Sequence, residues 1–385
     1  MERTLFEPEH EHFRESVRTF LDRHVIPNHL RWREQRRIDR EAWTEAGRHD
    51  FLGISMPAEL GGGGVDDFRF NVVLSEELAA IGLALASSFG IHTDVVAPYL
   101  SELASEQQQQ RWVPAFCSGE LVTAIGMTEA GAGSDLAAIR TTASREGEDW
   151  LLSGSKTFIT NGMSADLVVV AARTGEASRA ISLFAVEAAS PGFERGRKLE
   201  KAGQPEADTA ELFFENVRLP ADALLGEVDR GFAAMMERLP QERLHTAVSN
   251  VAHAGAALAS TLVYVKDRRA FGRPVGSFQS SRFLLAELAT ELDVTQAYVD
   301  RCVELHVEHR LSPIDAAKAK WWSAEVQNRV IDACVQLHGG YGYMTEYDVT
   351  RAWLDARVSK IWAGSNEIMK EIIGRDLGLG DPHPA

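Results

Sequence analysis

The spacing of apolar residues divides the chain into a helical part, a strand-rich part and a second helical part. Residues 8–22 place four apolar side chains on one helical face, which are those of Phe13, Val17, Phe20 and Leu21. Residues 40–50, 68–86 and 106–118 are predicted to be further helices, and Ser105 with Gln108 forms a capping box before the last of them. Pro57 and the four glycines 61–64 indicate a flexible loop over residues 54–67.

After Gly119 the pattern changes to short runs of β-branched and aromatic residues separated by Gly, Ser, Asn and Pro. The predicted strands are Trp150–Ile159, Leu167–Ala172, Ile181–Val186 and Thr209–Val217. The run from Leu167 to Ala172 is apolar enough for a buried strand. These runs predict a β domain over residues 121–228.

Helical periodicity returns near residue 230 and continues to the end of the chain. Residues 285–302 repeat apolar side chains at a period of 3.6, and Asp315 opens another long helix that Gly339 and Gly340 are suited to cap. Two shorter helices are predicted at 349–362 and 366–377. The predicted fold class is therefore α+β, with an all-α domain at 1–120, a β domain at 121–228 and a helical bundle at 229–385.

Composition narrows the function classes only slightly. The formal net charge of −16 over 385 residues makes nucleic acid an unfavourable partner, although it allows a local basic pocket. The three cysteines are far apart and form no C-x-x-C or Cys/His cluster, so we expect reduced thiols, a cytoplasmic location and no metal site. The N-terminus lacks the apolar segment of a secretory signal, and no run approaches the ~18 apolar residues of a membrane span.

The stretch AIGMTEAGAGSD at 124–135 is the first candidate for ligand binding. Its small residues allow backbone N–H groups to approach a ligand closely. It is neither a Rossmann fingerprint, because Leu136 occupies the third glycine position, nor a P-loop, because no Gly-Lys-Ser/Thr follows. We interpret it as one wall of a site for a planar, polar ligand.

Five ordered motifs make the chain resemble the acyl-CoA dehydrogenase family from end to end. They are AIGMTEAGAGSD (124–135), SGSKTFITNG (153–162), DRRAFGRPVGSFQ (267–279), QLHGGYGYMTEY (336–347) and WAGSNEIMKEIIGR (362–375), and PQERL (240–244) is similar to the long-chain type. The resemblance implies an N-terminal helical domain, a middle β barrel or sandwich and a C-terminal four-helix bundle. It also implies FAD, an acyl-CoA substrate, α,β-desaturation, an electron-transfer flavoprotein as acceptor and a homotetramer built as a dimer of dimers.

The resemblance also assigns cofactor contacts, residue by residue. In the β domain these are Met127, Thr128, Ser134, Phe158, Ile159 and Thr160, with Thr160 near flavin N5 and Ser134 also near the substrate. The FAD of the neighbouring subunit is implied to contact Arg268, Phe271, Gln279, Gln336, Leu337, His338, Gly339 and Gly340. A further contact is implied at a helix N-terminus, by Ser365, Asn366 and Glu367.

The catalytic base is where the chain departs from many members of the family. Position 363, often a glutamate in relatives, is Ala363 here, whereas Glu242 matches the base of the long-chain and isovaleryl types. The resemblance therefore implies that Glu242 removes the α-proton, that Arg243 lies near the substrate, and that the Ala363 backbone N–H helps to stabilise the enolate oxygen. Taken alone, Glu242 could equally be a first-turn acidic residue after Pro240, or the partner of a neighbouring arginine.

Three alternatives stay open from the sequence. The same fold could act as an oxidase that delivers electrons to O₂, or could act on an acyl group tethered to a carrier protein. A different class, the non-catalytic flavoprotein scaffold, would make Ala363 a sign of lost activity. The length of the acyl chain is not predicted.

Overall fold

The computed structural model describes residues 3–379 and begins with a layer of helices. These are α1 (Pro8–Phe20), α2 (Ile26–Gln35), α3 (Arg40–Arg48), α4 (Arg69–Ile81), α5 (Leu83–Gly90), α6 (Ala97–Glu102) and α7 (Glu106–Ser118), with π-helical turns at Leu21–Val25 and Ile91–Val96. The predicted helices are present, and Ser105 and Gln108 form the expected capping box of α7. The helical stretches at 26–35 and 91–102 escaped prediction, and the extended backbone of Gly82 divides the predicted helix 68–86 into α4 and α5.

The β region is one sheet whose strands run in the order β6-β7-β3-β2-β4-β5-β8, with β1 beside β4. Its strands are β1 (Thr123–Gly126), β2 (Thr142–Glu146), β3 (Asp149–Thr160), β4 (Leu167–Arg173), β5 (Ile181–Glu187), β6 (Phe193–Lys198), β7 (Thr209–Leu219) and β8 (Leu224–Leu225). All four predicted strands occur, while the short β1, β2, β6 and β8 were not predicted. β2 and β4 are joined only at Thr142 and Arg173, so the sheet is divided there into two halves.

Strand β4 shows why residues 167–172 are apolar without alternation. Val168 and Val170 pack into the core of the β domain, whereas Leu167 and Val169 join a cluster with the helices α6 and α7. Because both faces of this strand are buried, both sets of side chains are apolar. The same packing fixes the β domain against the N-terminal helices.

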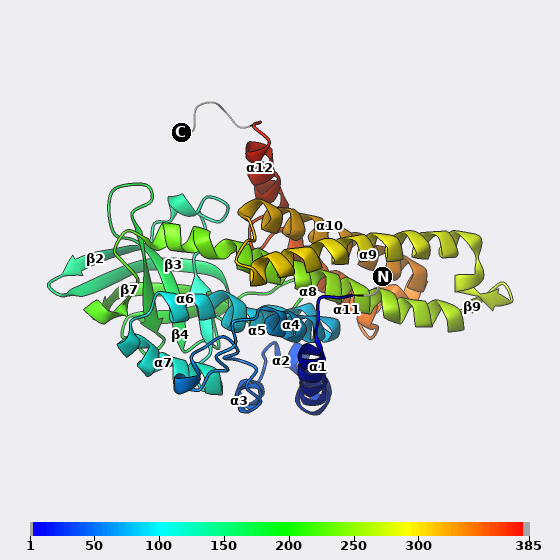
Figure 1. The fold of residues 1–385 in the computed structure, drawn as a ribbon, viewed down its shortest axis with the longest axis horizontal. Helices are drawn as coiled ribbons and strands as arrows, with labels where there is room; N and C mark the ends of the chain where they lie inside the picture. Colours follow the sequence, from blue (N-terminus) through cyan, green and yellow to red (C-terminus); the bar gives the residue numbers. More distant parts are fainter. Residues whose placement is uncertain (1–2, 380–385) are drawn as a thin grey trace.

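Long helices form the C-terminal part, and α8 spans from the β domain to the far end of the molecule (Figure 1). The helices are α8 (Gly231–Asp267), α9 (Gln279–Val307), α10 (Pro313–His338), α11 (Asp348–Ala356) and α12 (Asn366–Asp376), with the small hairpin β9 (Arg269–Ala270) and β10 (Arg273–Pro274) after α8. Gly339 ends α10 with a φ of 60° and a ψ of −137°, a conformation open to glycine but different from the usual left-handed cap, and its N–H donates to the Gln336 carbonyl. The predicted helix 349–362 ends earlier, at Ala356, and a 3₁₀ turn follows it.

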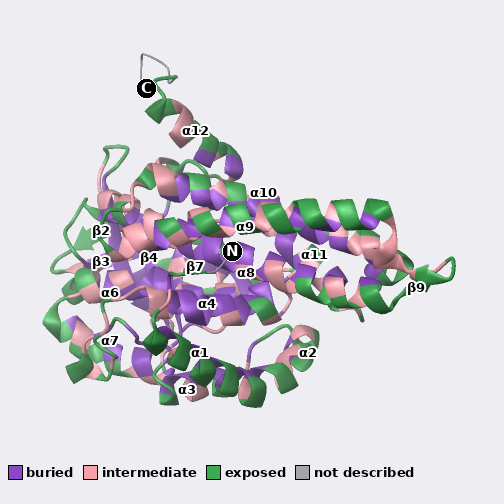
Figure 2. Ribbon diagram, turned by 45° about the vertical axis from the view of Figure 1, so that its right-hand side comes forward, coloured by how far each residue is buried: buried purple, intermediate pink, exposed green. Residues whose placement is uncertain are grey.

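Helix α8 is long and apolar enough to cross a membrane by length and composition. However, 56% of its most apolar window is buried inside the protein, as expected for the central helix of a folded domain. Figure 2 shows α8 and α4 at the buried centre, with exposed residues on the outer side of α9.

Candidate functional site

The predicted site residues fall into two groups that lie apart in the structure. The first lies where the β domain meets the start of α8 and the turn before α12, and the second lies around β9, at the far end of α8 (Figure 1). One chain therefore does not bring all the predicted cofactor residues together. The separation agrees with the expectation that the second group serves a neighbouring subunit.

A buried ion pair supports the loop that follows β1. Lys156 of β3 donates from Nζ to the Met127 carbonyl (3.1 Å) and to Oε1 of Glu129 (2.7 Å). Glu129 also accepts the backbone N–H groups of Arg140 and Thr141. Burial lowers the pKa of Lys156 to about 8, and the carboxylate of Glu129 opposes this shift. The pair was not predicted from the sequence, and it fixes the backbone on which Met127, Thr128 and Ser134 lie.

The three predicted ring contacts on β3 differ in exposure. Phe158 is 67% exposed and has a φ of +60°, which is unfavourable for a residue with a side chain. Thr160 is half-buried, and Ile159 packs into the β-domain core. The exposed aromatic ring suits a flat ligand, whereas Ile159 can contact one only through its backbone.

Glu242 lies on α8 beside Tyr99 of α6. The Tyr99 hydroxyl donates to Oε1 of Glu242 over 3.4 Å, and the ring of Tyr99 belongs to the apolar cluster against which Met127 packs. Burial raises the pKa of Glu242 to about 7, although Arg243 and the hydrogen bond from Tyr99 favour the carboxylate. A carboxyl group with such a pKa can exchange a proton near neutral pH.

The structure removes one alternative interpretation of Glu242. Pro240 lies inside α8, nine residues after its first residue, so Glu242 is not in a first turn where the helix dipole would favour it. Arg238 pairs instead with Glu102 and Glu237. Arg243 is only 6% exposed and its Nε has no hydrogen-bond partner in the described chain. A buried donor without a partner is costly, which points to a ligand near Arg243.

The turn before α12 has an unusual backbone. Ala363 and Gly364 are successive left-handed residues, with φ of +51° and +85°. The Ala363 N–H donates no hydrogen bond within the described residues. Ser365 caps α12 by accepting the Ile368 N–H, and Asn366 is buried. The turn thus presents a free backbone donor in a strained conformation, as binding sites often do.

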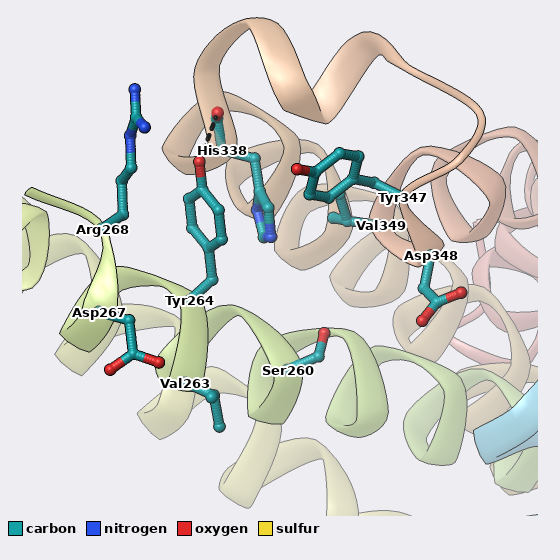
Figure 3. A pocket seen from close by; sticks show the side chains of 9 residues that line it. All are labelled: Ser260, Val263, Tyr264, Asp267, Arg268, His338, Tyr347, Asp348 and Val349. Carbon is teal, nitrogen blue, oxygen red and sulfur yellow. Dashed lines mark hydrogen bonds between the residues drawn. The ribbon is translucent and has the colours of Figure 1, made fainter.

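Two residues of the second group, Arg268 and His338, help to line a pocket of about 520 Å³ at the far end of α8 (Figure 3). Arg268 is at its edge, and its guanidinium lies 5.3 Å from the ring of Tyr341. The rings of Tyr264 and His338 stack at 4.0 Å, and His338 Nδ1 donates to the Cys334 carbonyl (2.8 Å). His338 is therefore a buried packing residue, and its geometry gives no support to a catalytic role.

Other residues of this second group face away from the chain. Phe271 is 96% exposed and has a φ of +52°. Gln279 and Gln336 are exposed, and Leu337 is half-buried. A Cβ added to Gly339 or Gly340 would meet nothing within 4 Å. The space around Gly340 is therefore open, and nothing within the described chain blocks the predicted approach of a ligand or a second chain there.

One group of side chains could in principle share a metal ion. His24, Glu45 and His49 place their ligand atoms within 4.8 Å of one another. Glu45 already pairs with Arg48, and His49 stacks on Phe51. These contacts account for the cluster, and the absence of a resident metal stays a prediction.

The structure combines helical N- and C-terminal domains with a central β domain, and it places the buried carboxyl group of Glu242 on α8 beside the apolar cluster that contains Tyr99. These features define a class of three-domain enzymes. Models of the N-terminal, middle and C-terminal domains of acyl-CoA dehydrogenase match residues 7–120, 124–217 and 229–378. The chain therefore belongs to the acyl-CoA dehydrogenase family and is an enzyme of that family. The predicted fold class is confirmed.

Individual relatives agree with this assignment. The long-chain specific acyl-CoA dehydrogenase of Sus scrofa is 47% identical over 97% of this chain and 88% of its own. An acyl-CoA dehydrogenase structure from Geobacillus kaustophilus is 45% identical with a TM-score of 0.96, covering 98% of this chain and all of its own. A glutaryl-CoA dehydrogenase from Mycobacterium smegmatis, solved with FADH2, is 27% identical with a TM-score of 0.91 over 97% and 95%.

Proposed function

We propose that this enzyme removes the α-proton of an acyl-CoA with Glu242 and converts the thioester to its 2-enoyl product. The observation that carries the proposal is the position of Glu242 on α8, with a pKa raised to about 7 beside Tyr99, in a chain whose residue 363 is alanine. FAD is the cofactor of the family, and when bound it would supply the acceptor for the hydride that leaves Cβ.

The described residues fit that cofactor. The exposed ring of Phe158 offers a flat surface, and an added Cβ at Gly131 would meet nothing within 4 Å. Thr160 is half-buried at the end of β3, two residues after Phe158, and we expect its hydroxyl to contact the edge of the flavin. These residues would hold the flavin, and Ser365, Asn366 and Glu367 would approach it from the N-terminus of α12.

The substrate is held at its carbonyl group. An α-proton is acidic only when charge on the thioester oxygen is stabilised, and the free N–H of Ala363 is a suitable donor. Arg243 adds a buried positive charge next to the base, and its Nε has no hydrogen-bond partner among the described residues. Glu242 then takes the proton in a site where Tyr99 and the apolar cluster limit access of water.

Anaerobic mixing with acyl-CoAs of several chain lengths tests this proposal through bleaching of the flavin absorbance. We expect Glu242→Gln to retain FAD and to bleach at least ~10²-fold more slowly, because a general base typically contributes this much. Glu237→Gln is the matched control, since Glu237 is an exposed residue of the same helix. Equal rates for wild type and Glu242→Gln would disprove the assignment of the base.

The electron acceptor, the oligomeric state, the cellular location and the carrier of the acyl group belong to the same proposal. An electron-transfer flavoprotein is the expected acceptor, and peroxide formation in air without it would favour the oxidase.

The exposed apolar residues Phe271, Phe283 and Val294 support self-association to a dimer of dimers, which light scattering would measure. The buried free thiols Cys117, Cys302 and Cys334 are compatible with a reducing compartment such as the cytoplasm, and cell fractionation would test this. Substitution of acyl carrier thioesters for CoA substrates would test the carrier-protein alternative.

A further inference from the structure

Lys320 of α10 is fully buried, with 0% of its surface exposed. Its Nζ donates to the Gly364 carbonyl over 2.6 Å and lies 3.3 Å from Oδ1 of Asn366. Among the described residues, no carboxylate lies within 4.0 Å of this ammonium group. Lysine is rarely buried without an ionic partner, so its position demands a specific reason.

The surroundings of Lys320 connect the two parts of the proposed active site. Helix α10 packs against α8, which carries Glu242 and Arg243, and against α12, which follows the turn at 363–365. Burial lowers the pKa of Lys320 to about 7, Arg243 lowers it further, and Glu367 opposes the shift. The charged groups that influence the ammonium thus come from α8 and from α12.

Helix packing alone does not require a lysine here. Lys318, two residues earlier on the same helix, extends to solvent with 45% of its side chain exposed and pairs with Asp315. Lys320 instead crosses the interface and ends at the carbonyl of a left-handed glycine. Asn366 does not depend on this contact, because its Nδ2 also donates to Glu325 (2.9 Å) and to the Trp321 carbonyl.

We propose that Lys320 is a positioning residue for the turn that activates the thioester. Its ammonium group holds the Gly364 carbonyl, and this fixes the left-handed pair Ala363–Gly364 with the free Ala363 N–H turned toward the substrate carbonyl oxygen. This inference rests on the proposed function, since it concerns the same turn. It assigns Lys320 no contact with the reacting atoms.

Lys320→Met removes the donor and charge while preserving most of the volume, and Lys318→Met is the matched control on the same helix. The first measurement uses a 3-thia-acyl-CoA, whose α-anion can be titrated through its long-wavelength absorption with oxidised flavin. We expect Lys320→Met to keep its FAD, to raise the apparent pKa of the bound thioester by about one unit, and to bleach about tenfold more slowly with acyl-CoA. Lys320→Arg, which retains a cationic donor, should recover most of this loss, and Lys318→Met should match wild type.

A second measurement does not use activity. Hydrogen exchange followed by mass spectrometry should show faster exchange in the peptide covering 361–366 for Lys320→Met, and no change for Lys318→Met. If Lys320→Met does not fold with FAD, Lys320→Gln replaces it with the same expectations. The inference is overturned if the folded variant titrates the α-anion as wild type does. Failure of wild type to bleach or to form the anion would instead reject the proposed function.

Discussion

The hydroxyl of Tyr99 lies 3.4 Å from Oε1 of Glu242, so α6 of the N-terminal domain supplies a hydrogen bond to the proposed base on α8. This contact stabilises the carboxylate, whereas burial disfavours it, and burial is the larger effect because the pKa of Glu242 is raised to about 7. Together, the two opposing effects place the pKa of Glu242 near neutral pH. They also make its protonation sensitive to single substitutions.

The first prediction concerns the pH dependence of reduction. Glu242 acts as a base only when ionised, so the bleaching rate should rise about tenfold per pH unit below 7 and level off above it. Tyr99→Phe removes a donor to the carboxylate and should move this midpoint upward by up to about one unit. Stopped-flow bleaching between pH 5.5 and 9 measures both midpoints. A midpoint that Tyr99→Phe lowers would contradict the proposed role of this hydrogen bond.

The second prediction concerns stability. Folding raises the pKa of Glu242 from 4.5 to about 7. The protonated carboxyl group therefore contributes fully to the free energy of unfolding below pH 4.5, and this contribution is lost as pH rises through 7. Glu242→Gln cannot ionise and should therefore be more stable than wild type above pH 7, by on the order of 1–3 kcal/mol. Urea unfolding at pH 5 and pH 8 would measure the free energy of unfolding of both proteins, and the difference in favour of Glu242→Gln should be larger at pH 8. A difference of equal size at both pH values would indicate a cause other than ionisation.

The third prediction uses the open backbone at Gly340. An added Cβ there meets nothing within 4 Å, so Gly340→Ala should fold with unchanged secondary structure. If the glycine exists for close approach of the neighbouring subunit's FAD, the same variant should lose cofactor on gel filtration. Gly374→Ala is the control, because its Cβ also meets open space but it lies outside the predicted sites. Full FAD retention by Gly340→Ala would remove Gly340 from the cofactor site.

Much of the fold could be predicted from the periodicity of apolar residues, and the helices and strands that were not predicted have identifiable physical causes. Helices α6 and α2 are continuous with π-helical turns, which disturb the 3.6 period on which prediction depends. Short strands such as β6, with exposed charged residues, carry little apolar pattern. Tertiary contacts between distant segments, such as Lys156 with Met127, leave no periodic signal at all.

The candidate site was predicted through motifs, but its supporting residues were not. Lys320 could have been noticed, because Ala316, Ala317, Ser323 and Ala324 at i−4, i−3, i+3 and i+4 are small and buried, which places Lys320 on the same inward face. Its target could not have been predicted, since the Gly364 carbonyl is set by a left-handed turn 44 residues later. The partner of Glu242 was hidden for the same reason, because Tyr99 and Glu242 meet only through packing of α6 on α8.

The last prediction tests whether one cofactor site is built by two chains. Arg268 directly follows the last residue of α8, whereas Glu242 lies in the first third of this 37-residue helix. We therefore expect each site of a symmetric dimer to combine Glu242 of one chain with Arg268 of the other. Arg268→Leu should weaken FAD binding in its partner's site, because a guanidinium suits phosphate oxygens, and Glu242→Gln should bind FAD without reacting. Co-expression of the two variants gives hybrid dimers in which one of two sites has both residues intact. We expect the random mixture to recover about one quarter of wild-type activity, measured against each variant purified alone. If both residues served the same chain's cofactor, every chain in the mixture would keep its own defect, and no activity beyond the average of the two variants would appear.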